Sequence, residues 1–212
     1  MTKAANRSVS VEHARRLAKR LLRKTPERWQ HTRGVADRAA ELAGAVKPTD
    51  RRLLIAAAWL HDIGYSPFIR RTGFHPLDGG LYLRKHRWDP RLAALVVHHS
   101  GARFVPVERG FADQMAKFAF EESPLSDALT YADQTVGPQG RRMTIEYRIN
   151  EAITRHGPDS PNARARVDRV PYLLAAAARV EDQLSRMGAE SGLRVLRLRT
   201  GGSVAPARRG GA

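Results

Sequence analysis

Residues 53–62 of the chain read LLIAAAWLHD, and this stretch decides the fold. Its first eight residues, Leu53 to Leu60, are apolar around the whole circumference of a helix, a pattern that predicts a helix buried on all sides. The two residues that end it, His61 and Asp62, are costly to remove from water unless another group compensates them. The stretch therefore predicts a central helix that carries a polar pair into the interior of the protein.

The segments on both sides of this helix also show helical periodicity, and no run of alternating β-branched residues favours a sheet. Thr25-Pro26 and Ser123-Pro124 are typical helix starts, with a capping residue followed by proline in the first turn. Pro171 is expected to bend or divide the last helix. The chain is predicted to be all-α, with further helices at about 10–23, 26–46, 76–85, 90–98, 124–133, 144–155 and 161–187.

The length of 212 residues fits one domain with a single core. We expect this domain to occupy residues 1–190. From about Ser191 onward the sequence is rich in glycine, arginine, serine and proline, which predicts a basic and disordered tail over 191–212.

The chain contains no cysteine, which excludes disulfide frameworks, thiolate zinc sites and cysteine nucleophiles. Any metal is therefore expected on nitrogen and oxygen ligands. No apolar run approaches the roughly 20 residues that span a bilayer, and the first residues lack the apolar stretch of a secretory signal. These features predict a cytoplasmic protein that does not bind a membrane.

The formal net charge of +16 favours partners that carry phosphate, from small nucleotides to nucleic acids. Part of the positive charge lies in the first predicted helix and in the tail. Solvated basic faces are the ordinary interpretation of such charge, and nucleic-acid binding through the basic surface or the tail stays open. The sequence does not indicate an oligomeric state.

Two more polar residues interrupt apolar helical stretches. His31 shares a helix face with apolar residues spaced three or four positions apart, and Asp133 ends the apolar stretch 128–132. Each one alone is ordinarily a hydrogen-bonded core histidine or a polar contact at a helix end. Together with His61 and Asp62, they form a set of two imidazoles and two carboxylates that suits divalent iron, manganese, zinc or cobalt.

In this order on helices, His31, the doublet His61-Asp62, and Asp133 resemble the H…HD…D signature of the HD-domain superfamily. The resemblance covers about residues 26–156 and includes the segment from Leu60 to Gly64. It implies an all-α, HD-domain-like helical bundle with a metal site in its core. It also implies a metal-dependent phosphohydrolase in which these four residues bind a metal and Asp62 and His61 are catalytic.

Four histidines fall between the doublet and Asp133, where superfamily members with two metals have extra ligands. His86 lies in a charged stretch and is interpreted as a surface residue, which leaves His75, His98 and His99. The resemblance therefore implies two divalent ions, with Asp62 as the bridging ligand and His75 and His98 on the second ion. His98 is preferred because apolar residues precede it. His99, the next residue, is expected to be a ligand or a phosphate contact.

The sequence departs from the superfamily at one position. Many related hydrolases have a lysine a few residues after the doublet, where it can contact phosphate, but this chain has Tyr65. A cation must then come from elsewhere, and Arg33, Arg70 and Arg71 are the candidates for substrate binding. The Gly-Tyr-Pro element of the cyclic-dinucleotide phosphodiesterases is also missing, so cyclic di-GMP is not favoured.

The expected function is hydrolysis of a small phosphorylated substrate by a metal-activated water. The substrate is a nucleotide, a dinucleoside polyphosphate or another small phosphate ester. Two alternatives stay open at this point. One is an HD-fold diiron oxygenase, which uses a similar ligand set, and the other is a non-catalytic HD domain that binds a phosphate ligand or nucleic acid.

Overall fold

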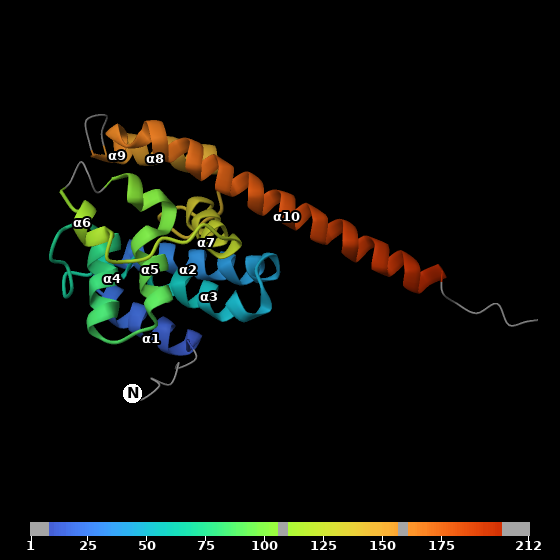
Figure 1. Cartoon of the computed structure of the whole chain (residues 1–212), viewed down its shortest axis with the longest axis horizontal. Helices are drawn as coiled ribbons and strands as arrows, with labels where there is room; N and C mark the ends of the chain where they lie inside the picture. Colours follow the sequence, from blue (N-terminus) through green and yellow to red (C-terminus); the bar gives the residue numbers. More distant parts are fainter. Residues whose placement is uncertain (1–8, 106–109, 157–160, 201–212) are drawn as a thin grey trace, which may run out of the picture.

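The computed structural model describes residues 9–105, 110–156 and 161–200, and within these ranges it contains helices and no strand (Figure 1). This confirms the prediction of an all-α fold. The α-helices are α1 (Val11–Leu22), α2 (Pro26–Glu41), α3 (Arg51–Leu60), α4 (His75–Lys85), α5 (Pro90–His98), α6 (Ala112–Met115), α7 (Pro124–Gln134), α8 (Ile145–His156), α9 (Pro161–Arg164) and α10 (Arg166–Thr200). Short 3-10 helices are η1 (Leu42–Ala45), η2 (Pro48–Asp50), η3 (Ile63–Tyr65) and η4 (His99–Phe104).

Helix α3 is the centre of the bundle, as its sequence predicts. It packs against α1, α2, α5 and α7, and seven of its ten residues are buried. The small side chains of Ala56, Ala57 and Ala58 let neighbouring helices approach closely, while Leu54 and Leu60 are fully buried. Each of these leucines contributes about 1.5 to 3 kcal/mol of transfer free energy to folding.

The predicted helix starts are observed, with one difference. The hydroxyl of Ser123 accepts a hydrogen bond from the backbone N–H of Ser126 at 3.2 Å and caps α7. Thr25 precedes α2 at the N-cap position, but its hydroxyl donates to the carbonyl of Leu22 at 3.0 Å. The hydroxyl of Thr25 therefore satisfies a carbonyl at the C-terminal end of α1 and does not cap α2. This is possible because only three residues separate the two helices.

The C-terminal helices differ from the prediction. The division falls between α9 and α10, before Pro171, which lies inside α10. The carbonyl that Pro171 leaves without a helical donor belongs to Val167, a residue that is 80% exposed, so water can satisfy it.

Helix α10 also runs past Ser191 to Thr200 and extends away from the body of the bundle (Figure 1). The leucines and arginines of 193–199 are good helix formers, which explains why the helix does not end where glycine and serine first appear. The predicted disorder of 201–212 lies outside the described residues. Over the part of the chain that the structure describes, no helix is long and apolar enough to cross a membrane.

Candidate metal centre

The C-terminal end of α3 delivers its polar pair to a place where four other elements meet. Helix α2 lies on one side, α7 on another, and η4 and the start of α4 complete the surroundings. These elements bring together the side chains of His31, His61, Asp62, His75, His99 and Asp133.

Three of these side chains form a compact group of donor atoms. The Nε2 atom of His31 lies 2.9 Å from Oδ1 of Asp133 and 3.4 Å from Nε2 of His61. Nε2 of His61 lies 3.7 Å from the same oxygen of Asp133. All three residues are buried, so the group is shielded from bulk water.

Asp62 presents its two oxygens to two different groups. Its Oδ2 lies 3.5 Å from Nε2 of His61 and 3.7 Å from Nε2 of His31. Its Oδ1 lies 3.3 Å from Nε2 of His75 and 4.0 Å from Nε2 of His99. This carboxylate therefore stands between two sets of imidazoles, which is the position of a bridging ligand.

Three of the histidines turn the Nδ1 side of the ring to a backbone carbonyl. The pairs are His31 with Gly137 at 3.1 Å, His61 with Ala58 at 2.7 Å and His99 with Val96 at 2.6 Å. A carbonyl oxygen only accepts hydrogen bonds, so Nδ1 carries the proton and Nε2 points its lone pair into the cluster. This arrangement is typical of histidines that bind metal ions.

The hydrogen bond from His31 depends on a close approach between α2 and the loop that follows α7. Gly34 permits this approach, because a Cβ atom at that position would lie 2.7 Å from the carbonyl oxygen of Gly140. A larger residue would push the loop, and with it the carbonyl of Gly137, away from His31. Gly34 thus helps to hold the imidazole of His31 in its orientation.

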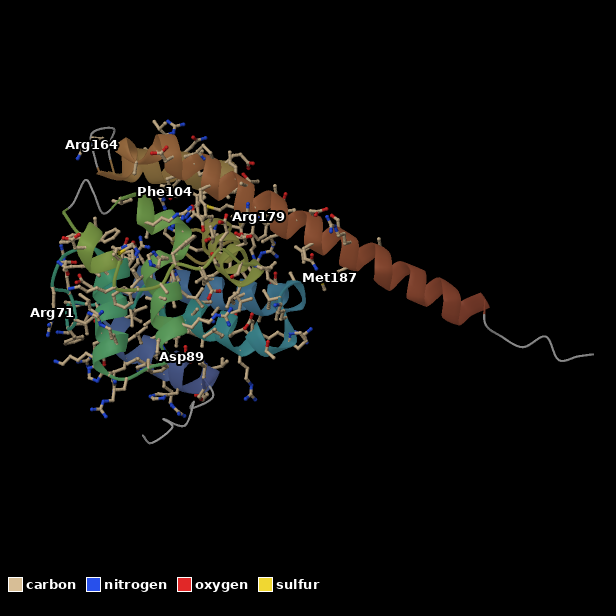
Figure 2. The ribbon with its side chains drawn as sticks, viewed as in Figure 1. Arg71, Asp89, Phe104, Arg164, Arg179 and Met187 are labelled. Atoms are coloured by element: carbon tan, nitrogen blue, oxygen red, sulfur yellow. The ribbon has the colours of Figure 1, made fainter. Side chains whose placement is uncertain are left out.

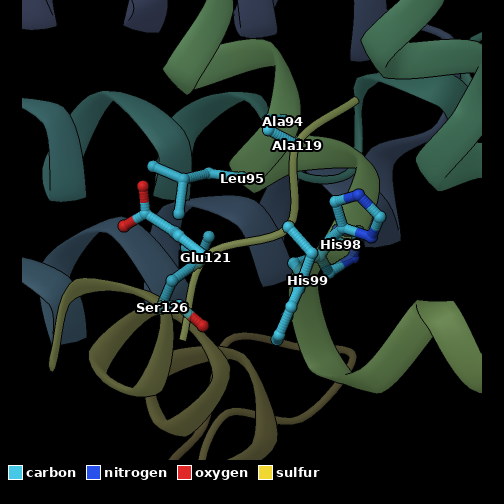
Figure 3. Close-up of a pocket in the computed structure, with 9 residues that line it drawn as sticks. Ala94, Leu95, His98, His99, Ala119, Glu121 and Ser126 are labelled. Atoms are coloured by element: carbon cyan, nitrogen blue, oxygen red, sulfur yellow. The ribbon is translucent and has the colours of Figure 1, made fainter. Parts of the chain in front are cut away.

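Helix α5 ends between two adjacent histidines that have different environments. His99 leaves the helix with ψ 149°, and Ser100 and Gly101 follow with left-handed φ angles of 53° and 66°. This turn directs His99 into the cluster, whereas Nε2 of His98 donates to the carbonyl of Phe118 at 2.9 Å. Figure 3 shows the small pocket that His98 lines. The structure therefore places His99 in the cluster and His98 outside it, the opposite of the order preferred from the sequence.

His75 reaches the cluster from the first turn of α4. The backbone of Gly64 in η3 packs against it so closely that a Cβ atom on Gly64 would lie 1.9 Å from the His75 carbonyl oxygen. Asp78 holds the preceding loop by accepting from the backbone N–H and the hydroxyl of Thr72, at 2.9 and 3.0 Å. The imidazole of His75 stacks on the ring of Tyr65, with 4.0 Å between the centroids.

Both carboxylates of the cluster are ionised. Burial alone would raise the pKa of Asp62 and Asp133. In the metal-free cluster, where protons on Nε2 take the place of a metal ion, the positive charges of His61 and Arg28 outweigh this effect at Asp62, and the hydrogen bond and charge of His31, with the charge of His61, outweigh it at Asp133. The pKa of each carboxyl is therefore well below its usual value, and each oxygen is available as an acceptor or a ligand.

The second oxygen of Asp133 is held by its neighbours. The hydroxyl of Ser100 donates a short hydrogen bond to Oδ2, and Nε2 of Gln134 donates to the same atom at 2.9 Å. The carbonyl of Ser100 in turn accepts from Nε of Arg169 at 2.9 Å. These contacts fix the carboxylate so that Oδ1 faces the histidines.

The cluster opens into a pocket of about 610 Å³, part of it open to solvent. Asp62, His75, His99 and Asp133 lie on its wall. The other lining residues include three arginines and an apolar group, namely Arg28, Arg148, Arg169, Phe74, Pro76, Ala102 and Val105.

None of the three arginines predicted to bind substrate lines this pocket. Arg33, Arg70 and Arg71 are exposed, and Figure 2 shows Arg71 at the outer edge of the molecule. Arg33 follows His31 by two positions on α2, which places it about 200 degrees around the helix from the buried imidazole. The structure therefore does not bring these three arginines to the cluster.

Arg28, and not Arg33, Arg70 or Arg71, lies on the pocket wall beside the cluster. It lies three residues before His31, on the same face of α2. Its guanidinium donates to Oδ2 of Asp62 at 3.1 Å and lies 4.5 Å from the centre of the Tyr65 ring. The spacing from His31 is a sequence signal that could have identified Arg28.

The donor set fits a divalent transition metal. Ligand atoms about 2.1 Å from one ion are about 3.0 to 3.4 Å apart in octahedral or tetrahedral geometry, close to the separations between His31, His61 and Asp133. Burial, the largest influence, lowers the pKa of His75 and His99, so both rings are neutral and can donate a lone pair. Nitrogen and oxygen donors without thiolate suit iron, manganese, zinc or cobalt.

Comparison with known proteins agrees with this site. The family model described as HD domain matches residues 28–187, a range that contains all six residues of the cluster. Searches of the curated proteins and of the solved structures gave no match.

Proposed function

Because the chain belongs to the HD-domain family, we propose that it is a metal-dependent phosphohydrolase. The proposed substrate is a small phosphate ester, such as a nucleotide or a dinucleoside polyphosphate, and the proposed nucleophile is water. Asp62 and His61 are the residues at the centre of the reaction site.

The observation that carries the proposal is the inward direction of the three Nε2 lone pairs. With Nδ1 protonated on His31, His61 and His99, the cluster contains lone pairs and carboxylate oxygens that face one another at 2.9 to 4.0 Å. Such groups repel each other in a buried site unless protons on Nε2 or a metal cation lie between them. Because every Nδ1 atom of these three rings is already bonded to a carbonyl, the Nε2 atoms are free to exchange such protons for a metal ion, which supports metal binding.

The residues divide into two ligand sets that share one carboxylate. His31, His61, Asp62 and Asp133 would hold one ion, and Asp62, His75 and His99 would hold a second. Divalent ions bound at such a site lower the pKa of water and polarise phosphoryl oxygens.

Arg28 has a separate role in this proposal. Its bond to Asp62 uses one of the five N–H donors of a guanidinium, and the pocket lies beside the others. The ring of Tyr65 restricts its movement from one side. Arg28 is therefore proposed to bind non-reacting oxygens of the phosphoryl group and to orient it over Asp62.

The same ligands would also suit the diiron oxygenase and the non-catalytic binder. Three arginines on the pocket wall favour an anionic substrate, which supports a phosphate ester over an uncharged molecule. A complete set of ionised and lone-pair donors supports catalysis over binding alone.

The test is metal analysis combined with an anaerobic screen of nucleotides and other phosphate esters. We expect two equivalents of divalent metal per chain and release of phosphate from at least one ester without oxygen. A chelator should abolish the release, and added metal should restore it. Oxygen consumption by a fully loaded protein that releases no phosphate would instead identify an oxygenase, and a single equivalent of metal would contradict the second ion.

A further inference from the structure

A buried and a half-buried arginine from the C-terminal helices, Arg148 and Arg169, lie on the pocket wall together with Asp133. Arg148 of α8 is 5% exposed; one terminal nitrogen donates to Glu151 at 2.5 Å, and its Nε has no hydrogen-bond partner. Arg169 of α10 donates its Nε to the carbonyl of Ser100 at 2.9 Å. The side chain of Arg169 lines the pocket. Among the described residues, no acceptor is hydrogen-bonded to its two terminal nitrogens.

The positive charge at this wall is only partly compensated. Burial lowers the pKa of Arg169, the charge of Arg148 lowers it further, and the charge of Asp133 opposes both effects. Asp133 already faces His31 and His61 with one oxygen and is a proposed metal ligand. Glu151 compensates Arg148, but the printed hydrogen bond of Arg169 goes to a neutral carbonyl, so the guanidinium of Arg169 and the free Nε of Arg148 leave donors and positive charge for an anion of the substrate.

We propose that Arg148 and Arg169 bind a second phosphoryl group, next to the one that reacts over Asp62, so that the substrate is an organic diphosphate. This inference rests on the proposed phosphohydrolase function and names its substrate class. Arg28 stands beside Asp62, whereas this pair stands beside Asp133 and Ser100, which gives the pocket two separate sets of guanidinium donors. Guanidinium groups bind phosphoryl oxygens through paired N–H bonds.

The remaining wall of the pocket suits the organic part of such a molecule. Phe74, Ala102 and Val105 are apolar and largely buried, and the flat ring of Tyr65 lies on the same pocket.

The reaction that this binding mode predicts is cleavage between the two phosphoryl groups. The oxygen of water forms a bond to the outer phosphorus, and the bond from that phosphorus to the bridging oxygen breaks. The bridging oxygen keeps the electron pair and leaves on the inner phosphate, while one proton of the water passes to solvent. The products are inorganic phosphate and an organic monophosphate, and the two arginines stabilise the charge that develops on the inner phosphate.

The test compares two non-hydrolysable probes, methylphosphonate with one phosphorus and methylenediphosphonate with two, by calorimetry on the metal-loaded protein. We expect Arg148→Gln and Arg169→Gln each to weaken diphosphonate binding by about tenfold or more, and to change monophosphonate binding by less than about threefold. Arg166→Gln is the matched control, because Arg166 lies on the same helix as Arg169 but is exposed; it should change neither affinity. Metal content before and after each titration excludes extraction of metal by the probe.

Thermal unfolding keeps the test valid if a variant is destabilised. Bound diphosphonate should raise the unfolding temperature of the wild type, and this rise should be lost in the arginine variants whatever their starting stability. Equal weakening of both probes, or no weakening of either, would overturn the second phosphoryl site. Phosphate release from esters is measured separately, so a protein that binds diphosphonate through these arginines but hydrolyses nothing contradicts the proposed function alone.

Discussion

The two walls of the pocket are built in different ways. The ligand side consists of His31, His61, Asp62, His75, His99 and Asp133, and three of its imidazoles are fixed by backbone carbonyls, two in helices α3 and α5 and one in the loop that follows α7. The arginine side consists of Arg148 and Arg169, whose long side chains reach in from α8 and α10 and are held by one hydrogen bond each. Under the proposed function, the core would fix the chemistry, and the helices after Asp133 would determine which molecule is bound.

The largest expected effect comes from breaking the ligand side at its shared residue. In Asp62→Ala, both ligand sets lose a donor, so we expect metal content to fall below one equivalent and phosphate release to fall by about a thousandfold or more. Elemental analysis and the phosphate assay measure the two effects. Asp182→Ala, an exposed acid on α10, is the control. Full activity in the Asp62 variant would contradict the metal-hydrolase proposal.

The adjacent histidines at the end of α5 sharpen the comparison, because only one belongs to the ligand side. His99→Ala should weaken metal binding and lower turnover by about 10- to 100-fold. His98→Ala removes a hydrogen bond to Phe118, so we expect a loss of about 1 kcal/mol in the free energy of unfolding and turnover within about threefold. The reverse order of the two effects would show that His98 is the ligand after all.

A third change tests whether the ligand side depends on close packing. In Gly64→Ala, the new methyl group collides with the carbonyl of His75, so we expect a loss of about 1 to 3 kcal/mol in stability and weaker binding of the second ion. Chemical denaturation with and without metal measures both. Gly188→Ala, where a Cβ atom meets nothing within 4 Å, should be neutral or slightly stabilising. Equal stability of the two variants would contradict the tight contact.

The smallest effect on turnover is expected from removal of the C-terminal part of α10, beyond the two arginines. Deleting residues 191–212 leaves Arg148, Arg169 and all proposed ligands in place, so turnover of a small substrate should stay within about threefold. Metal content should be unchanged. Loss of metal on truncation would mean that the end of α10 supports the core.

Much of the ligand side could be predicted from the sequence, because polar residues on apolar helices are informative. His61 and Asp62 follow the most apolar helix, and His31 and Asp133 interrupt apolar stretches, so burial and function could be inferred together. That His99 and not His98 enters the cluster could not be predicted. It depends on a left-handed turn at Ser100, a residue that rarely adopts this conformation.

The arginine side left a weaker signal that was missed. Arg148 lies three residues after Ile145 and next to Ile149, and Arg169 lies four residues from both Ala165 and Leu173. Each arginine therefore occupies an apolar helix face, in the same way as His31. In a chain with 37 lysines and arginines, charged side chains on exposed faces conceal these two positions.

Ser100 shows what the site requires of the fold. Its backbone has the left-handed φ of 53°, which costs a residue other than glycine about 1 to 2 kcal/mol. The hydroxyl that glycine would lack is the group that donates to Asp133. Glycine at position 100 would relieve this backbone cost but lose a hydrogen bond to an ionised carboxylate, worth about 1.5 to 3 kcal/mol, so the serine is retained for the orientation of the carboxylate at position 133 and not for ease of folding.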